Sequence, residues 1–551
     1  MTSPPVELAF FGGLGEIGAN MASIEVDGLI ALIDVGLTFP DAEHFGIDLI
    51  LPDWSRLRER RDDVHCIVIT HGHEDHMGAL PFFLREFPSV PIYGTKLTLA
   101  LINAKLEEHP NIDADLREVE TGERLQTGPF DIEFVGVTHS IPDGMAVAFH
   151  TPHGTILHSG DFKLDQTPID GRPTDLPHLA QLGDDGVALL LADSTNAENP
   201  GHVKSESTIG KTLRDVFGEA QGQIIVTTFA SHVHRVQQVI DASIETGRKV
   251  CFVGRSMVRN MPIARDLGYL HFEERNVCEL DEVGADEHDR IVIICTGSQG
   301  EPYAALSLMA AGQHRQITLE QGDTVVMASS VIPGNESAIY KTINGLFRQG
   351  ARVIHKGLAD VHVSGHAAAD ELKFFHNIVR AAAFVPVHGE YRHLLAHARI
   401  AEQTGTPPDQ ILVCEDGDTV MLVDGRVSRG EPFEPGRVYV DGLGVGDVGN
   451  AVLRERGKLS EEGICVAVVQ IDQHTRIVDA PRIFQQGVIY EPEQGDLLAE
   501  AAKMLREELD EAGHGDGDPA AVRRTVSSAL GRFWRDQTGR RPVILPILVE
   551  V

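Results

Sequence analysis

The chain has 551 residues, of which 42% are hydrophobic, and its formal net charge is −35. This length predicts two to four domains rather than a single core. The acidic composition argues against a nonspecific nucleic-acid binder, because phosphate contacts require Lys and Arg, although a local basic channel and bound divalent cations can coexist with an acidic exterior.

The sequence shows no basic segment followed by a long apolar core at its start, and no run of the roughly 20 apolar residues that span a bilayer. We therefore expect no signal peptide, no membrane contact and a cytoplasmic location. The six cysteines form no C-x-x-C pair and are expected to be buried reduced thiols. The 26 histidines are the more unusual feature, since imidazole is a common metal ligand.

A glycine-rich segment is the first motif along the chain. Gly13-Leu-Gly15-Glu-Ile-Gly18 matches the dinucleotide-binding pattern G-x-G-x-x-G, which requires a helix to begin at the glycines. Here the next residues, 21–26 and 29–34, are apolar runs that flank Asp27-Gly28, which is typical of a β-hairpin. We therefore reject nucleotide binding and interpret the glycines as tight-turn residues.

Three imidazoles and two carboxylates follow within six residues, in His71-Gly-His73-Glu-Asp75-His76, directly after the apolar run 66–70. Imidazole nitrogen and carboxylate oxygen are donors that zinc and manganese accept. A strand that delivers such a cluster to its carboxyl end indicates metal-assisted hydrolysis. The spacing of apolar residues over 77–87 predicts a helix after the cluster.

Further candidate ligands occur where later strands end. Strands are predicted at 130–137, 146–150, 154–159, 187–192 and 383–387. His139, Asp161 and His388 each follow one of these strands. Each alone is more simply a turn or cap residue, but the seven candidates together fit a two-metal site bridged by one carboxylate.

From about residue 205 the pattern changes to alternating strands and helices. Buried parallel strands are predicted at 224–229, 249–253, 290–295 and 324–328, with helices such as 233–246 between them. This alternation indicates an inserted α/β domain, after which strand signals return at 351–355 and 383–387. After about 450 we expect a small α/β domain with strand 464–471, helix 497–512, a Gly/Asp-rich break at 513–519, a second helix to about 537 and strand 542–551.

The motifs resemble, in order, those of a known group of hydrolases. The series H-x-H-x-D-H at 71–76, His139, Asp161 within Ser-Gly-Asp, and His388 resembles the ligand series of the metallo-β-lactamase fold. The motifs Asp193-Ser-Thr-Asn, Val361–His366 and Val387-His-Gly-Glu390 resemble its β-CASP branch, which processes nucleic acids. The resemblance implies an α/β architecture: a metallo-β-lactamase αββα sandwich, an inserted β-CASP α/β domain and a small C-terminal α/β domain.

Three further motifs resemble the bacterial ribonuclease J family within that branch: Gly12–Met21, Phe229-Ala-Ser-His-Val-His-Arg235 and Pro333-Gly-Asn-Glu336. The likeness runs from about residue 6 to 450, and the C-terminal domain also fits. On this basis we expect the first domain at 1–205, the inserted domain at 206–350, the second part of the first domain with a linker at 351–450, and the C-terminal domain at 451–551.

The resemblance assigns a role to each candidate ligand. It places His71, His73 and His139 on one divalent ion, places Asp75, His76 and His388 on the other, and makes Asp161 the bridge. Asp34 and Asp193 are expected to orient ligand imidazoles from behind. Asp193 is also a candidate catalytic residue, as are Asp75 and His366, the last by stabilising the transition-state phosphate or protonating the leaving oxygen.

Two further sites are implied by the resemblance. The segments 231–233 and 362–366 correspond to the family's pocket for RNA phosphate, including a 5′-monophosphate, through Ser231, His232, Val233, His362, Val363, Ser364, Gly365 and His366. His232 departs from the family, which has Asn at this position. Gly46, Asp48 and Asp441 line up with an additional cation site suited to Ca²⁺ or Mg²⁺, although surface-turn carboxylates explain them equally well.

The expected activity is that of a two-metal phosphodiesterase that matures and degrades RNA. The resemblance implies 5′→3′ exonuclease action with a preference for 5′-monophosphate ends, and endonucleolytic cleavage can accompany it. The alternatives are a related nuclease acting on DNA, a hydrolase of a small ester, and a non-catalytic scaffold of an RNA-degradation complex. Expected partners are single-stranded RNA, a second copy in a homodimer or homotetramer, and such a complex; zinc and manganese both fit the two metal positions.

Overall fold

The computed structural model describes residues 4–41, 43–109, 111–283, 285–301, 303–330, 335–489, 494–513 and 518–551. Pro333 and Gly334 of the Pro333–Glu336 motif, and residues 514–517 of the expected break, lie outside the described residues. The chain divides into two compact units, Met1–Asp41 with Leu49–Val438, and Ala42–Asp48 with Tyr439–Val551. Within the described residues, no helix is both long and apolar enough to cross a membrane.

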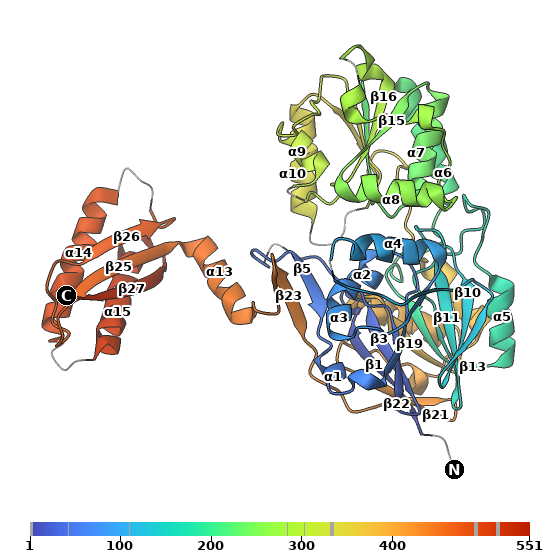
Figure 1. The fold of residues 1–551 in the computed structure, drawn as a ribbon, viewed down its shortest axis with the longest axis horizontal. Coiled ribbons are helices and arrows are strands. Elements are labelled where there is room, and N and C mark those ends of the chain that lie inside the picture. The colour runs from blue at the N-terminus through green and yellow to red at the C-terminus, as the bar shows by residue number, and fades with distance from the viewer. Residues whose placement is uncertain are drawn as a thin grey trace. The chain divides into compact units, whose positions relative to one another are not determined.

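Two mixed sheets form the base of the first unit (Figure 1). The first has the order β22-β21-β1-β3-β4-β6-β7-β8, with bounds Arg426–Arg429, Thr419–Val423, Val6–Gly12, Met21–Val26, Leu29–Ile33, Val64–Val68, Ile92–Gly94 and Leu116–Glu118. The second has the order β19-β13-β12-β11-β10-β9, with bounds Ala383–Val387, Val187–Asp193, Gly154–His158, Met145–Thr151, Phe130–Gly136 and Arg124–Thr127.

The two sheets share one hydrophobic core. Side chains from the first sheet, such as Leu8 and Ile24, and from the second, such as Phe134 and Leu189, are fully buried in the same cluster. The outer face of the second sheet packs against α5 (Leu176–Asp185), α11 (Ala369–Val379) and α12 (Tyr391–Gln403). The first sheet contacts α4 (Lys96–Leu106) through β7 and β8. The expected αββα sandwich is confirmed.

The inserted domain is a five-stranded sheet with helices on both faces (Figure 1). Its strands are all parallel, in the order β15-β16-β14-β17-β18, with bounds Lys249–Val253, Ile291–Cys295, Ile224–Thr227, Thr324–Met327 and Arg352–His355. The strands are runs of Val and Ile because both faces are buried. One face packs on α6 (Ser207–Glu219), α7 (Val233–Glu245) and α8 (Arg255–Asp266), and the other on α9 (Ala305–Ala310) and α10 (Glu336–Arg348).

Strand β18 corrects the expected domain boundary at residue 350. It pairs with β17 and therefore belongs to the inserted sheet. Residues 351–355 were expected in the second part of the first domain. The burial pattern of a strand does not identify its partner, so the sequence alone could not assign it.

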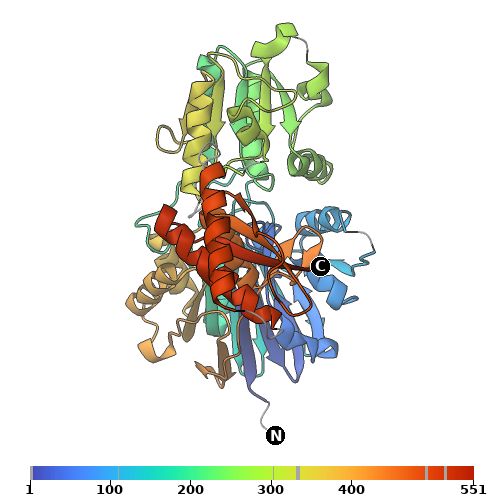
Figure 2. The ribbon, with the colours of Figure 1, turned by 90° about the vertical axis from the view of Figure 1, so that its left-hand side faces the viewer.

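The second unit has a three-stranded sheet in the order β26-β25-β27, with bounds Arg482–Gln486, Ile464–Ile471 and Val543–Glu550. The helices α14 (Gln494–Glu511) and α15 (Pro519–Thr538) lie side by side, as Figures 1 and 2 show in red, and pack with the sheet around Trp534 and Leu505. Pro546 is accommodated because β27 is an edge strand. The small α/β domain expected after about 450 is confirmed.

The glycine segment forms a turn and opens no helix. Gly13, Gly15 and Gly18 all have φ near +90°, and the chain continues into the β3–β4 hairpin. The hairpin turns at Asp27 (φ +50°) and Gly28 (φ +81°), the left-handed pair that two-residue hairpins require. The rejection of nucleotide binding therefore agrees with the local structure.

The helix expected at 77–87 is confirmed, but it begins three residues later than expected. The structure has α2 (Glu74–Met77), then a break, then α3 (Leu80–Glu86). Pro81 lies at the start of α3, where its missing N–H costs nothing, and Ala79 N donates to Val35 O instead of to a helical carbonyl. The apolar spacing identified the buried face but not the interruption.

Asp416 is a buried carboxyl group next to the glycine turn, and we expect it to make the stability of the protein depend on pH. Burial, and the nearby charge of Glu16, raise the pKa of Asp416 from 3.8 to about 7. Its Oδ1 accepts a hydrogen bond from Leu14 N at 2.9 Å. Because the folded-state pKa is raised, the stabilisation is complete below pH 3.8 and is lost as the pH rises through about 7.

We therefore expect Asp416→Asn, which keeps the acceptor, to be more stable than the parent at pH 8, by about 2 kcal/mol. The difference should shrink at pH 5, where the parent carboxyl is protonated. Thermal unfolding at both values of pH measures it. Asp409→Asn, at an exposed position, should show the same small difference at both values. An equal gain for Asp416→Asn at pH 5 and pH 8 would contradict the prediction.

Candidate metal centre

The candidate ligands lie at the carboxyl ends of strands. His71 to His76 follow β6, His139 follows β10, Asp161 follows β12 and His388 follows β19. Strands β12, β13 and β19 are parallel neighbours, so Asp161, the terminal Asp193 of β13 and His388 come together at one edge of the second sheet. His388 has φ +52°, a left-handed conformation that turns the chain just past the strand.

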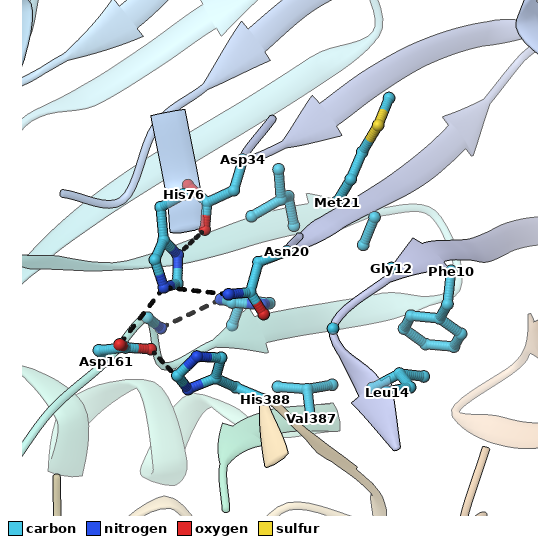
Figure 3. A pocket seen from close by; sticks show the side chains of 15 residues that line it. Phe10, Gly12, Leu14, Asn20, Met21, Asp34, His76, Asp161, Val387 and His388 are labelled. Carbon is cyan, nitrogen blue, oxygen red and sulfur yellow. Dashed lines mark hydrogen bonds and ion pairs between the residues drawn. The ribbon is translucent and has the colours of Figure 1, made fainter. Parts of the chain in front are cut away.

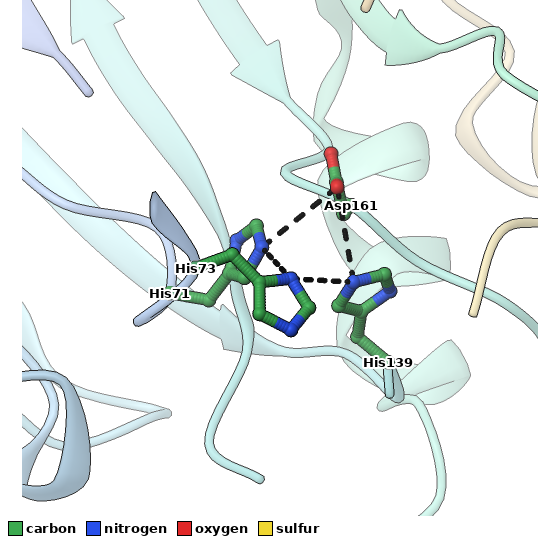
Figure 4. A group of neighbouring side chains, drawn as sticks. All are labelled: His71, His73, His139 and Asp161. Atoms are coloured by element: carbon green, nitrogen blue, oxygen red, sulfur yellow. Dashed lines mark hydrogen bonds and ion pairs between the residues drawn. The ribbon is translucent and has the colours of Figure 1, made fainter. Parts of the chain in front are cut away.

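The first donor group consists of His71, His73, His139 and Asp161, whose donor atoms all lie within 4.8 Å of one another (Figure 4). His73 Nδ1 is 3.0 Å from His71 Nε2 and 3.2 Å from His139 Nε2. Asp161 Oδ2 lies 3.7 Å from His71 Nε2 and 3.8 Å from His139 Nε2. Three imidazoles and one carboxylate thus converge on one point.

The second donor group consists of Asp75, His76, His388 and again Asp161; Figure 3 shows the last three of these. His76 Nε2 is 3.3 Å from Asp161 Oδ2, and His388 Nδ1 is 3.3 Å from Asp161 Oδ1. His388 Nε2 is 3.4 Å from Asp75 Oδ2. A third group joins Asp161 and His388 with Asp193 and His366. Asp161 is common to all three groups, and its two oxygens face different histidines.

Carboxylates and carbonyls behind the site fix the imidazole rings. Asp34 Oδ2 accepts a hydrogen bond from His76 Nδ1 at 2.7 Å, which turns Nε2 toward Asp161. Asp34 Oδ1 in turn accepts from Thr70 N at 2.8 Å. His139 Nδ1 donates to Gly365 O at 2.8 Å. Partners of this kind set the tautomer and raise the basicity of a ligand histidine.

His366 is paired with Asp193 at the edge of the cluster. Its Nδ1 donates to Asp193 Oδ2 at 2.7 Å, and its side chain is 20% exposed, whereas Asp193 is 2% exposed. Asp193 Oδ1 accepts from Thr195 N and Oγ1, and Asn196 Nδ2 donates to His366 O at 2.8 Å. The His366 ring is thus held from behind and faces the more open side of the cluster.

The protonation states differ between the two donor groups. Burial lowers the pKa of His73 to about 4 and those of His71 and His139 well below their ordinary range, so these imidazoles are neutral donors. Burial opposes the charge of Asp161, but His388 and His76 hold the pKa of its carboxyl well below its usual range. Conversely, burial lowers the pKa of His388, yet Asp161 and its neighbours raise it to about 10.

The residues fit divalent metal ions. The buried carboxylates of Asp161 and Asp193 converge with the half-buried carboxylate of Asp75, and this concentration of negative charge favours a bound cation. The buried Nε2 of His388 points to the same place, 3.4 Å from Asp75 Oδ2. Nitrogen and oxygen donors in these numbers match zinc and manganese chemistry.

The two segments expected to bind phosphate lie near each other. The rings of His232 and His362 are 6.4 Å apart, and the segment 231–233 leads into α7. Burial lowers the pKa of His232 to about 4. Within the described part of the chain, the buried His362 Nδ1 has no hydrogen-bond partner, whereas His232 Nε2 faces Glu206 Oε1 at 3.7 Å.

Several of the residues expected to bind phosphate are occupied by contacts with other residues of the chain. Val233 and Val363 are buried in the core of the inserted domain. Ser364 Oγ accepts hydrogen bonds from Asn196 Nδ2 and from His366 N. Gly365 O accepts a hydrogen bond from His139 Nδ1. Ser231 and Ser364 are half-buried, so backbone groups and these two hydroxyls are the groups that can reach a ligand.

Residues expected to form the additional cation site lie against the side chain of Arg456. Asp441 Oδ2 accepts from Arg456 Nη2 at 2.5 Å, and Arg456 Nη1 donates to Phe45 O at 2.9 Å. Asp48 Oδ2 accepts from Gly442 N. A Cβ on Gly46 would lie 2.8 Å from Arg456 Nη1. A guanidinium therefore supplies the positive charge at this position.

Sequence reasoning missed Asn20 and Thr195. Asn20 Nδ2 donates to Asp75 O at 3.0 Å and lies 3.2 Å from His76 Nε2 (Figure 3). Gly13 leaves room for it, because a Cβ there would lie 2.3 Å from Asn20 Oδ1. Thr195 Oγ1 is 2.9 Å from His388 Nδ1. The signal was present, since Asn20 lies within the Gly12–Met21 motif and Thr195 follows Asp193 by two residues.

Gly365 lies against His139 of the first donor group, so this position is expected to be sensitive to substitution. A Cβ on Gly365 would lie 2.7 Å from His139 Cε1 and 2.9 Å from His139 Nδ1. We expect Gly365→Ala to displace the His139 ring and lower metal affinity and RNA hydrolysis about 10- to 100-fold. Gly218→Ala, where a Cβ meets nothing within 4 Å, should leave both unchanged. Metal titration with a competing chelator and a single-turnover assay measure the effects; parent-like metal affinity of Gly365→Ala would refute the prediction.

Comparison with known proteins agrees with this geometry. The sequence matches family models for the metallo-β-lactamase superfamily over residues 14–199, the ribonuclease J β-CASP domain over 221–346, a Zn-dependent metallo-hydrolase RNA specificity domain over 350–411, and the ribonuclease J C-terminal domain over 451–551. The fold and site therefore define a metal-dependent nuclease of the β-CASP metallo-β-lactamase class.

Full-length relatives identify the family. A protein named Ribonuclease J from Mycolicibacterium smegmatis is 46% identical over 98% of this chain and 96% of its own length. Ribonuclease J2 of Bacillus subtilis is 40% identical over 99% of each chain. The chain belongs to the ribonuclease J family, and it is a metal-dependent ribonuclease that acts on RNA.

A solved structure of an Enterococcus faecalis protein of unknown function has a TM-score of 0.53 at 14% identity. It covers 76% of this chain and all of the other, and it supports the fold alone.

Proposed function

We propose that the chain hydrolyses RNA phosphodiesters with two divalent ions, zinc or manganese. One ion would be held by His71, His73 and His139, the other by Asp75, His76 and His388, and Asp161 would lie between them. The observation that carries the proposal is the position of Asp161, whose carboxylate belongs to every donor group of the cluster. Bound ions of this kind supply the Lewis acidity that activates water and neutralises charge on a phosphate.

The chain's own residues would complete the reaction. Asp34 keeps His76 in one tautomer, and Gly365 O does the same for His139. Asp193 holds the proton on His366 Nδ1, so His366 presents Nε2 to the scissile phosphate. From there it can donate a hydrogen bond to a phosphate oxygen or pass a proton to the leaving 3′ oxygen. Such help contributes about 10²–10⁴-fold to a rate.

We further propose 5′→3′ exonuclease action with a preference for 5′-monophosphate RNA, accompanied by endonucleolytic cleavage. The turns around Ser231 and Ser364 offer hydroxyls and backbone amides, which suit a phosphate group. The rings of His232 and His362 lie 6.4 Å apart in the same two segments, with His232 Nε2 3.7 Å from Glu206 Oε1. A terminal phosphate held there would fix the register of the strand entering the metal centre.

A time course on RNA labelled at the 5′ or the 3′ end tests the activity. The 5′-monophosphate and 5′-triphosphate forms are compared in Mn²⁺, Zn²⁺ and Mg²⁺. Early release of the 5′-terminal nucleotide, faster for the monophosphate, supports the proposal. Equal rates for both forms would overturn the end preference, and faster cleavage of matched DNA would favour the DNA nuclease. Tight RNA binding without turnover would indicate the scaffold.

We also propose that the protein acts in the cytoplasm as a homodimer or homotetramer, with or without an RNA-degradation complex. One face of the second unit's sheet is apolar and exposed, at Phe484, Leu545 and Ile547. Exposed apolar faces of this kind commonly mark contacts between protein chains. Sedimentation equilibrium of the full chain, compared with Ile547→Lys, tests the assembly.

A further inference from the structure

Two cysteines of the inserted domain touch each other outside the histidine cluster. The Sγ atoms of Cys251 and Cys278 are 2.8 Å apart, somewhat longer than the roughly 2.05 Å of a disulfide bond. Cys251 is buried on β15, whereas Cys278 is half-buried and follows the turn η2 (Glu274–Asn276). Cys66, Cys295, Cys414 and Cys465 are all buried.

The backbone holds the two cysteines in register. Val250 and Val277, the residues just before them, form a parallel bridge, and Cys278 N donates to Val250 O at 3.0 Å. Neighbouring strands lie about 4.8 Å apart, and a disulfide joins residues whose Cα atoms are about 4.4–6.8 Å apart. The turn before Cys278 is closed by Glu273 N donating to Asn276 Oδ1. Bond formation therefore requires only side-chain movement.

We propose that Cys251 and Cys278 are a reversible disulfide site that low-molecular-weight disulfides oxidise. The more exposed Cys278 thiol loses its proton and attacks the small disulfide, which releases one small thiolate. Cys251 then loses its proton and attacks Cys278 Sγ, forming the internal S–S bond and releasing the second small thiol. Two protein thiols are oxidised and one small disulfide is reduced to two thiols, so the exchange balances.

The order of the two steps follows from the surroundings. The contact with Cys278 and burial both raise the pKa of the Cys251 thiol, so Cys251 keeps its proton longer. Cys278 is the sulfur that a small molecule reaches first. Its mixed disulfide then lies against Cys251, where the second exchange is intramolecular and favoured by the high local concentration.

The bond would close a loop that makes contacts with the first domain. Residues 252–277 contain α8, whose Arg259 forms an ion pair with Glu108 at 2.5 Å. Tyr269 in the same loop donates a hydrogen bond to Asp143. Oxidation therefore restrains the segment through which the inserted domain contacts residues 108 and 143.

Incubation of the full chain with oxidised glutathione, followed by alkylation and tryptic mass spectrometry without reductant, tests the site. We expect peptides 250–255 and 276–290 to be joined, lighter by two hydrogen atoms than the two reduced peptides. The unfolding temperature should rise by about 5 °C, and dithiothreitol should reverse both changes. Wild-type protein that keeps glutathione on Cys278 without the link, or that leaves both thiols open to alkylation, would overturn the proposal.

Three variants complete the test. In Cys251→Ser, glutathione should remain on Cys278, because the attacking partner is missing. In Cys278→Ser, neither the link nor the rise in unfolding temperature should appear. Cys295→Ser removes a buried cysteine from the adjacent strand β16 and should keep both. Loss of the link in Cys295→Ser would also count against the assigned pair.

Discussion

Replacing Asp161 by asparagine is expected to lower the rate of RNA hydrolysis at least about a thousandfold without unfolding the protein. Both oxygens of Asp161 are used, Oδ1 facing His388 and Oδ2 facing His76, and no other residue joins all three donor groups. An amide of the same shape fills the space but removes the negative charge that two cations would share. We therefore expect loss of bound metal as well as loss of rate.

Glu74→Gln is the matched control, because Glu74 lies in the same six-residue cluster. Its Oε2 forms an ion pair with Lys105 at 2.6 Å rather than joining a donor group. This variant should keep near-parent activity and metal content. Single-turnover rates and metal analysis after dialysis measure both variants. If Asp161→Asn retained two ions per chain and a rate within tenfold of the parent, the proposed centre would be incorrect.

The candidate metal centre is the part of the molecule that the local sequence pattern predicts best. Its proposed ligands are rare residue types placed directly after apolar strands, and neighbouring parallel strands bring their carboxyl ends to one edge. The pattern therefore indicated His71, Asp161 and His388 before any pairing was known. The alternation after residue 205 likewise predicted the inserted parallel sheet.

The contacts between distant segments were not predictable from local pattern. Gly365 O orients His139 across 226 positions of sequence, and Asn20 reaches Asp75 across 55. A glycine or an asparagine has many ordinary uses, so its chemistry becomes visible only when the fold supplies the partner. The same reason explains β18, whose place in the inserted sheet depends on its neighbour β17.

Arg235 is the buried charge that we expect to matter most for stability. It is fully buried on α7, and its Nε and Nη2 donate to both oxygens of Glu206 at 2.5 and 2.8 Å. Its Nη1 donates to Ala328 O and Val361 O, each at 2.8 Å. Burial opposes the charge of Glu206, but Arg235 holds the pKa of that carboxyl well below its ordinary range.

We expect Arg235→Ala to destabilise the protein by about 3–5 kcal/mol, because it leaves the Glu206 carboxylate buried without its cation. Val361 directly precedes the 362–366 turn, so RNA affinity should fall as well. Arg235→Lys keeps the charge but loses the bidentate geometry, and it should recover only part of the stability. Thermal unfolding and RNA binding of the full chain measure both effects.

A surface ion pair provides the comparison that separates burial from charge. Arg352 Nη2 lies 2.8 Å from Glu219 Oε2, with both side chains more than half exposed. Arg352→Ala should therefore cost about 1 kcal/mol or less. Combining Arg235→Met with Glu206→Gln removes both buried charges and should recover stability relative to Arg235→Ala. RNA affinity should stay low in this double variant, since the anchor of the Val361 carbonyl is still missing; recovery of affinity would show that Arg235 stabilises the fold without positioning the turn.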